Sequence, residues 1–317
     1  MIPKAELHCH LEGSIPPALA IELAARNGIG LPDGMFDSNG HYVWRDFLTF
    51  LDAYDRVCRA LKTARDFGDV IYTYLKGAAA EGAIYVEVFC SPERPKALGI
   101  SYDSWLGALE DGINRARQEF GIEGRIIVVC IRHLGPDKAL DIARLMVGHP
   151  HKYVVGFGMG GDEAKFTPAD FAPAYRLAHE HGFGCTIHAG EVCGPESVWG
   201  AIRDLPVTRI GHGVRSAEDP MLLEDLARRG TILEVCPGSN VALGLYRSRA
   251  DHPLHRLIAA GVRVTLGSDD PPFFHTTLGT EYDKAGLGQD ALKRITRTAI
   301  EGSFADEATK QRLLKGI

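Results

Sequence analysis

The chain alternates short apolar or β-branched segments with longer amphipathic segments, and this alternation constrains its fold most strongly. Eight segments are expected as strands, at residues 5–10, 83–89, 125–131, 153–157, 184–187, 208–210, 231–235 and 262–266. The clearest helices between them are expected at 101–120, 136–147, 168–181, 220–229 and 252–260. Repeated βα units form a parallel sheet with helices outside it. Eight units favour a closed barrel over an open doubly wound sheet, so the expected fold class is α/β, a (β/α)8 or TIM barrel.

Two segments do not fit a single βα unit. Residues 33–75 are expected as a helical insertion after the first strand, in a position to act as a lid over the pocket, and residues 290–317 as a helical C-terminal tail. A length of 317 residues fits either two domains or one barrel with insertions. Because no linker or repeat divides the chain, we expect a single barrel domain over 1–317.

Composition excludes several function classes. Lys plus Arg number 35 and Asp plus Glu 41, a formal charge of −6 without a long basic run, so nucleic acid is not expected as a partner. No apolar run approaches the ~18 residues of a membrane span. The N-terminal residues lack the pattern of a signal peptide, and the seven cysteines form no CxxC pair, which is typical of a reduced cytoplasmic protein. Oligomeric state does not follow from these features.

Chemistry-bearing residues follow the expected strands. His8 and His10 end the first strand and would share one face, because side chains alternate along a strand. The pair either binds one metal ion or is two polar residues at a strand exit. His188 ends the fifth strand and Asp269 follows the eighth, where a metal ligand and an ordinary structural residue are both possible. Glu191 lies where a general acid or base would serve a metal site, with a helix cap as the alternative.

Glycines accompany two further candidates. His212 stands between two glycines, which allow close approach to a ligand, although a structural histidine is the alternative. The glycines in 158–163 would let backbone N–H groups meet a flat ligand, or would simply form a turn. All these elements lie at C-terminal strand ends, where barrel enzymes build their active sites. Three imidazoles and one carboxylate suit Zn²⁺ with a position left for water.

Six segments together resemble the adenosine deaminase family of the amidohydrolase superfamily, and they occur in the family's order: residues 3–13, 160–163, 188–191, 209–213, 236–240 and 268–271. The resemblance implies one Zn²⁺ per chain, held by His8, His10, His188 and Asp269. Relatives with two metals usually bridge them with a Lys after the fourth strand, and residues 156–163 contain no Lys. A second class of zinc deaminases carries PCxxC, which is absent here.

The resemblance also implies a role for each remaining candidate. Glu191 would protonate the ring nitrogen beside the reacting carbon, and His212 would orient or deprotonate the attacking water. Asp270 would hold that water and contact the purine N7, and the main-chain N–H of Gly161 would meet another ring nitrogen. The expected catalytic residues are therefore Glu191, His212 and Asp270, and the expected substrate contacts are His10, Glu12, Gly161 and Asp270.

The implied reaction is the hydrolytic deamination of a 6-aminopurine small molecule. We expect adenosine or deoxyadenosine, giving inosine and ammonia in purine salvage, because 238–240 and 272–278 look closer to the nucleoside branch of the family. Glu12 departs from that branch, since adenosine deaminases usually carry Asp where the ribose 5′-hydroxyl is contacted. Strand alternation after His10 would aim Glu12 into the pocket. The alternatives are deamination of adenine or an N6-modified adenine to hypoxanthine, hydrolysis of a non-purine amide or ester, and a zinc-binding barrel without catalysis.

Overall fold

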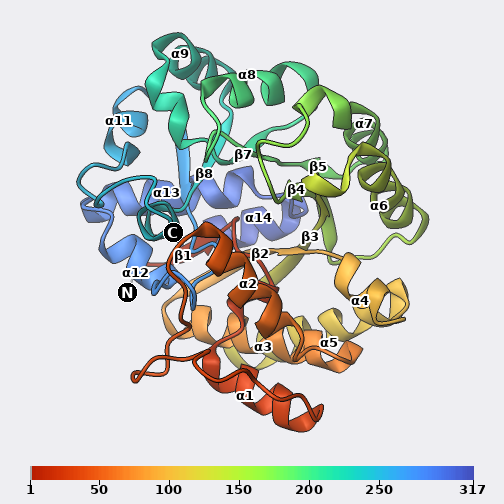
Figure 1. Ribbon diagram of the computed structural model, residues 1–317. Helices are drawn as coiled ribbons and strands as arrows, with labels where there is room; N and C mark the ends of the chain where they lie inside the picture. The colour runs from red at the N-terminus through yellow and green to blue at the C-terminus, as the bar shows by residue number, and fades with distance from the viewer. Residues whose placement is uncertain (1) are drawn as a thin grey trace.

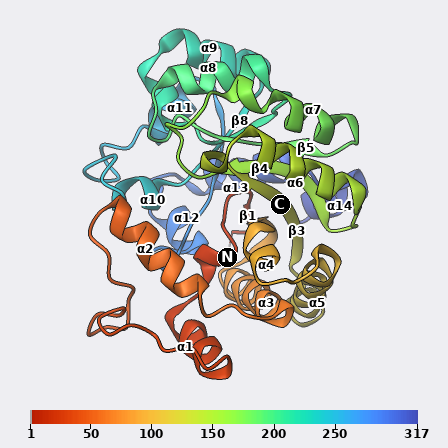
Figure 2. The same cartoon turned by 45° about the vertical axis from the view of Figure 1, so that its right-hand side comes forward.

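The computed structural model describes residues 2–317, apart from the side chains of Phe47 and Leu48. Its strands form two parallel sheets, ordered β1-β2-β3-β4-β5 and β6-β7-β8-β9. The strands are β1 Lys4–Glu6, β2 Ala83–Cys90, β3 Glu123–Ile131, β4 Val154–Gly160, β5 Gly184–Cys185, β6 His188–Ala189, β7 Arg209–His212, β8 Ile232–Val235 and β9 Arg263–Leu266. The central strands lie inside a ring of helices (Figures 1 and 2).

Backbone hydrogen bonds join the two sheets into one closed barrel. Strands β5 and β6 are two halves of the same barrel strand, since Thr186 N donates to Phe157 O and Gly211 N donates to Ile187 O. At the other seam, Cys9 forms a parallel bridge with Asp269. The eight expected strand positions are thus all occupied, and the expected α/β barrel is confirmed.

The helices follow the strands around the barrel. They are α1 Pro17–Arg26, α2 Phe47–Cys58, α3 Ala64–Ala80, α4 Glu93–Ala97, α5 Tyr102–Phe120, α6 Pro136–Gly148, α7 Ala172–Glu180, α8 Pro195–Asp204, α9 Pro220–Arg229, α10 Pro237–Ala242, α11 Leu254–Ala259, α12 Leu278–Asp283, α13 Gln289–Gly302 and α14 Glu307–Leu314. Local sequence sets several ends. Ser101 caps α5 by accepting from Ser104 N, and Gly230, with φ of 70°, ends α9 in the left-handed conformation.

The segment expected as an insertion has different bounds in the structure. Helices α1 and α2 come between β1 and β2, and α3 packs along α5 as a helix of the barrel wall. The expected range 33–75 therefore begins after α1 and ends inside α3. Within this range, helix α2 begins after its N-cap Asp46, whose side chain accepts from Thr49 N. Helix α2 lies at one end of the barrel and α14 at the opposite end (Figures 1 and 2).

The first strand is shorter than expected. It ends at Glu6, and residues 9 and 10 continue only as isolated bridges to Asp269 and Phe89. The C-terminal helices α13 and α14 are present as expected, and α13 packs against β1 and β9. None of the helices in the described part of the chain is long and apolar enough to cross a membrane.

Candidate active site

Four predicted ligands converge at the C-terminal ends of the strands. His8, His10, His188 and Asp269 offer ligand atoms that all lie within 4.8 Å of one another. The Nε2 atoms of His10 and His188 are 3.1 Å apart, and Asp269 Oδ1 lies 3.3 Å from His10 Nε2 and 3.5 Å from His8 Nε2. His8 and His10 point to the same side as expected, although regular strand β1 ends at Glu6, before both residues. Isolated parallel bridges of Cys9 with Asp269 and of His10 with Phe89 continue the extended backbone through these residues.

The donor set fits a cation. His8 Nδ1 lies 2.9 Å from Glu234, and the buried His8 Nε2 faces Asp269 Oδ1 at 3.5 Å. His188 Nδ1 donates to the carbonyl of Met159 at 2.7 Å. Each Nδ1 is thus held by an acceptor, and each Nε2 faces the centre, an arrangement that orients histidine ligands in metalloproteins. These contacts support a metal site.

Burial and neighbouring charges shift the pKa values of His8, His188 and Asp269, so that protons and a metal ion would compete for these groups. Burial lowers the pKa of His8, but hydrogen bonds with Asp269 and Glu234 outweigh it and raise the pKa to about 10. Burial and the neighbouring imidazoles hold the pKa of His188 well below its usual value. Burial alone would raise the pKa of Asp269, but hydrogen bonds from His10 and His8 lower it well below its usual value. Metal binding here would displace a proton.

A buried charged column, made of Glu87, Arg209 and Glu234, lies next to His8 in the barrel interior. Glu87, Arg209 and Glu234 are all completely buried. Arg209 lies 2.6 Å from Glu234 and 2.6 Å from Glu87, and its guanidinium stacks on Phe304 at 3.7 Å. Because Arg209 holds Glu234, and Glu234 holds His8, the column fixes the orientation of one predicted metal ligand.

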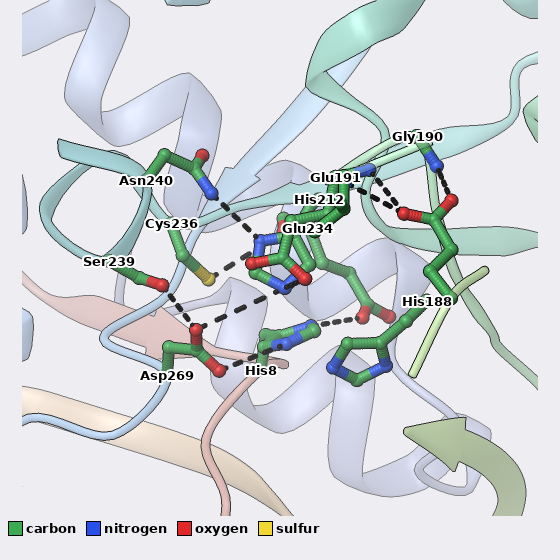
Figure 3. A network of polar contacts seen from close by, with 12 residues as sticks. His8, His188, Gly190, Glu191, His212, Glu234, Cys236, Ser239, Asn240 and Asp269 are labelled. Carbon is green, nitrogen blue, oxygen red and sulfur yellow. Dashed lines mark hydrogen bonds and ion pairs between the residues drawn. The ribbon is translucent and has the colours of Figure 1, made fainter. Parts of the chain in front are cut away.

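The loop after β6 carries Glu191 beside this cluster (Figure 3). Glu191 Oε2 lies 3.6 Å from His212 Nε2. Burial, and then the charges of Asp269 and Glu163, raise the pKa of Glu191 to about 8. A carboxyl group with this pKa is largely protonated at neutral pH, as a proton donor must be.

Glu163 fixes the backbone of that loop. Its buried carboxylate accepts a hydrogen bond from Ser197 Oγ at 2.6 Å and backbone N–H groups from four successive residues: Gly190, Glu191, Val192 and Cys193. Arg132 in turn donates to the carbonyl of Glu163 at 2.8 Å and to that of His188 at 3.2 Å. The turn that presents Glu191 is therefore tied to the end of β4.

His212 ends β7 with a positive φ of 59° and is almost completely buried. Its Nε2 faces Glu191, and its Nδ1 lies 3.3 Å from Asn240 Nδ2 (Figure 3). Ser239, next to Asn240, donates to Asp269 Oδ2 at 2.5 Å. The segment 236–240 thus supports His212 and Asp269.

The predicted substrate contacts surround the same centre. A Cβ at Gly160 would lie 3.5 Å from the His10 ring, which places the neighbouring Gly161, with φ of 101°, beside the cluster. Asp270 follows Asp269, and burial together with the Asp269 charge raises its pKa well above its usual value. A Cβ on Gly13 would approach Asp270 Oδ1 to 1.6 Å, so this close packing requires glycine.

Glu12 reaches the site by a different route from the one expected. It lies in a 3-10 turn, η1 Glu12–Ser14, so strand alternation does not apply. Its side chain is nevertheless buried, and Oε1 has no hydrogen-bond partner in the described chain. Burial raises the pKa of Glu12 to about 7.

The helical insertion packs against the loop that follows β9. Trp44 Nε1 donates to the carbonyl of Phe273 at 2.9 Å, and the Phe50 ring contacts the rings of Phe273 and Phe274. The side chains of Phe47 and Leu48, in the same insertion, lie outside the described residues. The lid function of this segment stays a prediction.

Residues 3–317 match the family described as adenosine deaminase. This chain belongs to the adenosine deaminase family. The adenine deaminase of Agrobacterium fabrum is 46% identical to it over 315 residues, covering 98% of this chain and 96% of that protein. The adenine deaminase of Chelativorans sp. is 46% identical over 317 residues, covering 99% and 97%.

Solved structures agree with this membership. The crystal structure of adenine deaminase from Arthrobacter aurescens superposes with a TM-score of 0.92 at 31% identity, covering 99% of this chain and 98% of that one. An amidohydrolase from Burkholderia ambifaria with bound Zn superposes with a TM-score of 0.88 at 28% identity, covering 98% and 88%. This chain is an enzyme, a hydrolytic deaminase.

The expectation of adenosine as substrate is wrong. Several relatives at 44–46% identity over nearly the whole chain are adenine deaminases, the alternative that Glu12 indicated. In the structure, the segments that suggested a nucleoside contact neighbouring protein residues. Ser239 and Asn240 contact Asp269 and His212, and Phe273 packs against the insertion.

Sequence patterns did not reveal the supporting residues Glu234, Arg209 and Glu163. Glu163 and Arg209 lie within segments 160–163 and 209–213 of the family resemblance, but nothing in those segments assigned them a role, and Glu234 lies in none of the six segments. A charged residue within an otherwise apolar strand, as in β8 with sequence ILEV, was the available signal for Glu234.

Proposed function

We propose that this chain hydrolyses adenine, or an N6-modified adenine, to hypoxanthine, releasing ammonia or the corresponding amine. The observation that carries the proposal is the buried carboxyl group of Glu12, whose Oε1 has no hydrogen-bond partner among the described residues, in a chain 43–46% identical to several adenine deaminases over nearly its whole length. Free adenine carries an N–H at N9, which a nucleoside replaces with the bond to its sugar. A buried carboxyl oxygen without a partner is a strong acceptor for that N–H.

Glu12 would also occupy space that a sugar needs. Its side chain is one methylene longer than the Asp that adenosine deaminases usually carry at this place. Because the carboxyl group is already buried without a ligand, a sugar would have to displace it. The same residue therefore favours the free base and disfavours the nucleoside.

The metal that suits the ligand set is Zn²⁺, one per chain, on His8, His10, His188 and Asp269. Bound there, Zn²⁺ supplies Lewis-acid activation of a water molecule, whose pKa falls towards about 7. The close approach of His10 Nε2 to His188 Nε2, and of Asp269 Oδ1 to the Nε2 atoms of His8 and His10, supports this assignment.

The remaining residues supply orientation and proton transfer. Glu191, protonated at neutral pH, donates to the ring nitrogen beside C6 and makes C6 more electrophilic. His212 directs the attacking water, and Asp270 holds that water and contacts N7. His10 lines the pocket, and the N–H of Gly161 meets another ring nitrogen. Loss of the amino group then leaves a 6-oxopurine.

The experiment is to load the full chain with Zn²⁺ and follow adenine, N6-methyladenine and adenosine by product analysis. We expect adenine or N6-methyladenine to yield hypoxanthine and one equivalent of ammonia or methylamine, with adenosine much poorer. No amine release from any of the three would contradict the proposal and favour a barrel without this catalysis. A purine small molecule is thus the proposed partner, and a cytoplasmic location stays a prediction.

A further inference from the structure

A buried row of polar contacts runs from the backbone of Leu254 to the ring of His212. Leu254 N lies 3.1 Å from His252 Nδ1, and His252 Nε2 lies 3.1 Å from Asn240 Oδ1. Asn240 Nδ2 then lies 3.3 Å from His212 Nδ1, and Figure 3 shows this amide directed at the ring. His252, Asn240 and His212 are all buried, so water does not compete for these contacts.

The direction of every hydrogen bond in this row follows from its first member. A backbone N–H only donates, so His252 Nδ1 accepts from Leu254 and carries no proton. The proton of His252 therefore lies on Nε2 and is donated to Asn240 Oδ1. With its oxygen accepting, Asn240 presents its NH₂ group to His212 Nδ1. His212 Nδ1 accepts, and the proton of His212 must lie on Nε2.

We propose that His252 and Asn240 are positioning residues that fix neutral His212 with its proton on Nε2, facing the active site. That atom lies 3.6 Å from Glu191 Oε2 and 4.0 Å from Asp269 Oδ2. In this form His212 donates a hydrogen bond into the site and has no free lone pair there with which to remove a proton from water. Of the two roles that the family resemblance implies, orientation of the water is therefore the one the geometry selects.

The tautomer is a property of the folded chain and is tested directly by NMR. Long-range ¹H–¹⁵N spectra of zinc-loaded protein with ¹⁵N-labelled histidine distinguish protonated from unprotonated ring nitrogens, and His212→Asn assigns the signal. We expect His212 with Nε2 protonated and Nδ1 unprotonated. A proton on Nδ1, alone or together with Nε2, would overturn the proposal. This readout is independent of the substrate, so failure of the proposed function would leave it intact.

Variants at His252 test the positioning role. His252→Phe keeps a ring but removes the donor to Asn240, which frees the amide to rotate. We expect a second His212 tautomer to appear in the spectra. We also expect kcat to fall by about 10-fold or more, but by less than the ~10⁴-fold that a fully wrong tautomer costs. KM and zinc content should stay unchanged. His252→Gln restores a donor to Asn240, so it should recover most of the single His212 tautomer and most of the wild-type kcat.

An exposed histidine provides the matched control. His149 pairs with Asp103 on α5, away from the row. His149→Phe should change neither the His212 signals nor kcat. If His252→Phe and His252→Gln are equally impaired with a single unchanged His212 tautomer, His252 only supports packing and the proposal fails.

Discussion

The carboxylate of Glu163, three residues beyond the end of β4, accepts the backbone N–H of Glu191 at 3.1 Å. It also holds the N–H groups of Val192 and Cys193, so one side chain organises the whole turn that carries the proposed proton donor.

Glu163→Gln should therefore misplace Glu191 without disturbing the metal ligands. The amide keeps the volume but turns an NH₂ group towards backbone donors, leaving buried groups unpaired at a cost of about 1–3 kcal/mol. We expect kcat to fall at least ~10-fold with zinc content retained, measured by steady-state kinetics and elemental analysis. Asp162→Asn is the control, since the Asp162 side chain accepts from the nearby Ala164 N and has no hydrogen bond to loop 190–193 among the described residues. Equal activity in wild type and Glu163→Gln would contradict the role of Glu163 in positioning Glu191.

Glu234→Gln should weaken metal binding. Glu234 orients His8 through Nδ1, and loss of such a partner typically costs 10–100-fold in metal affinity. We expect about one zinc per wild-type chain and a dissociation constant raised by roughly 10–100-fold in the variant. The His8→Ala/His10→Ala double variant should bind no zinc.

A buried carboxylate elsewhere in the barrel controls for the loss of charge. Glu123 on β3 is buried and paired with Arg125, without a contact to the ligands. Glu123→Gln should lower stability but leave zinc affinity unchanged. Zinc retained by the double variant, or an affinity equally low in both glutamine variants, would contradict the assignment.

Activity should depend on pH through Glu191. A proton donor works only when protonated, so kcat/KM is full below its pKa and falls about tenfold per pH unit above it. The pKa of about 8 sets the upper limit of this alkaline limb, because the charge of a bound metal favours the carboxylate and lowers the pKa. Glu191→Gln should lose at least ~100-fold in activity while keeping its zinc. A wild-type limb well above pH 8, or an active Glu191→Gln enzyme, would place the donor elsewhere.

Periodicity predicted the barrel because strands and helices bury apolar faces at different spacings, and those spacings are local. The convergence of His8, His10, His188 and Asp269 was also predictable, since each lies at or just beyond the C-terminal end of a barrel strand and all parallel strands end at the same side of the barrel. Helix α1 and the true start of α3 were missed because the segment after β1 packs outside the regular βα pattern.

Contacts between distant segments were not predictable in the same way. Arg209 and Glu87 are 122 positions apart and meet only once the barrel closes. The expectation of adenosine rested on the family likeness of short segments, without knowledge of their contacts in the fold. Asn240 was interpreted through family likeness to a nucleoside enzyme, whereas the structure shows its amide directed at His212.

The most direct test of the central claim is kcat/KM for adenine, 9-methyladenine and adenosine with the zinc-loaded enzyme. 9-Methyladenine lacks the N9 hydrogen but adds no sugar, so it isolates the contact assigned to Glu12. Adenine should exceed 9-methyladenine by roughly 10- to 150-fold, corresponding to a charge-assisted hydrogen bond of ~1.5–3 kcal/mol, and Glu12→Ala should abolish this difference. Adenosine or 9-methyladenine turned over by wild type as efficiently as adenine would contradict the account.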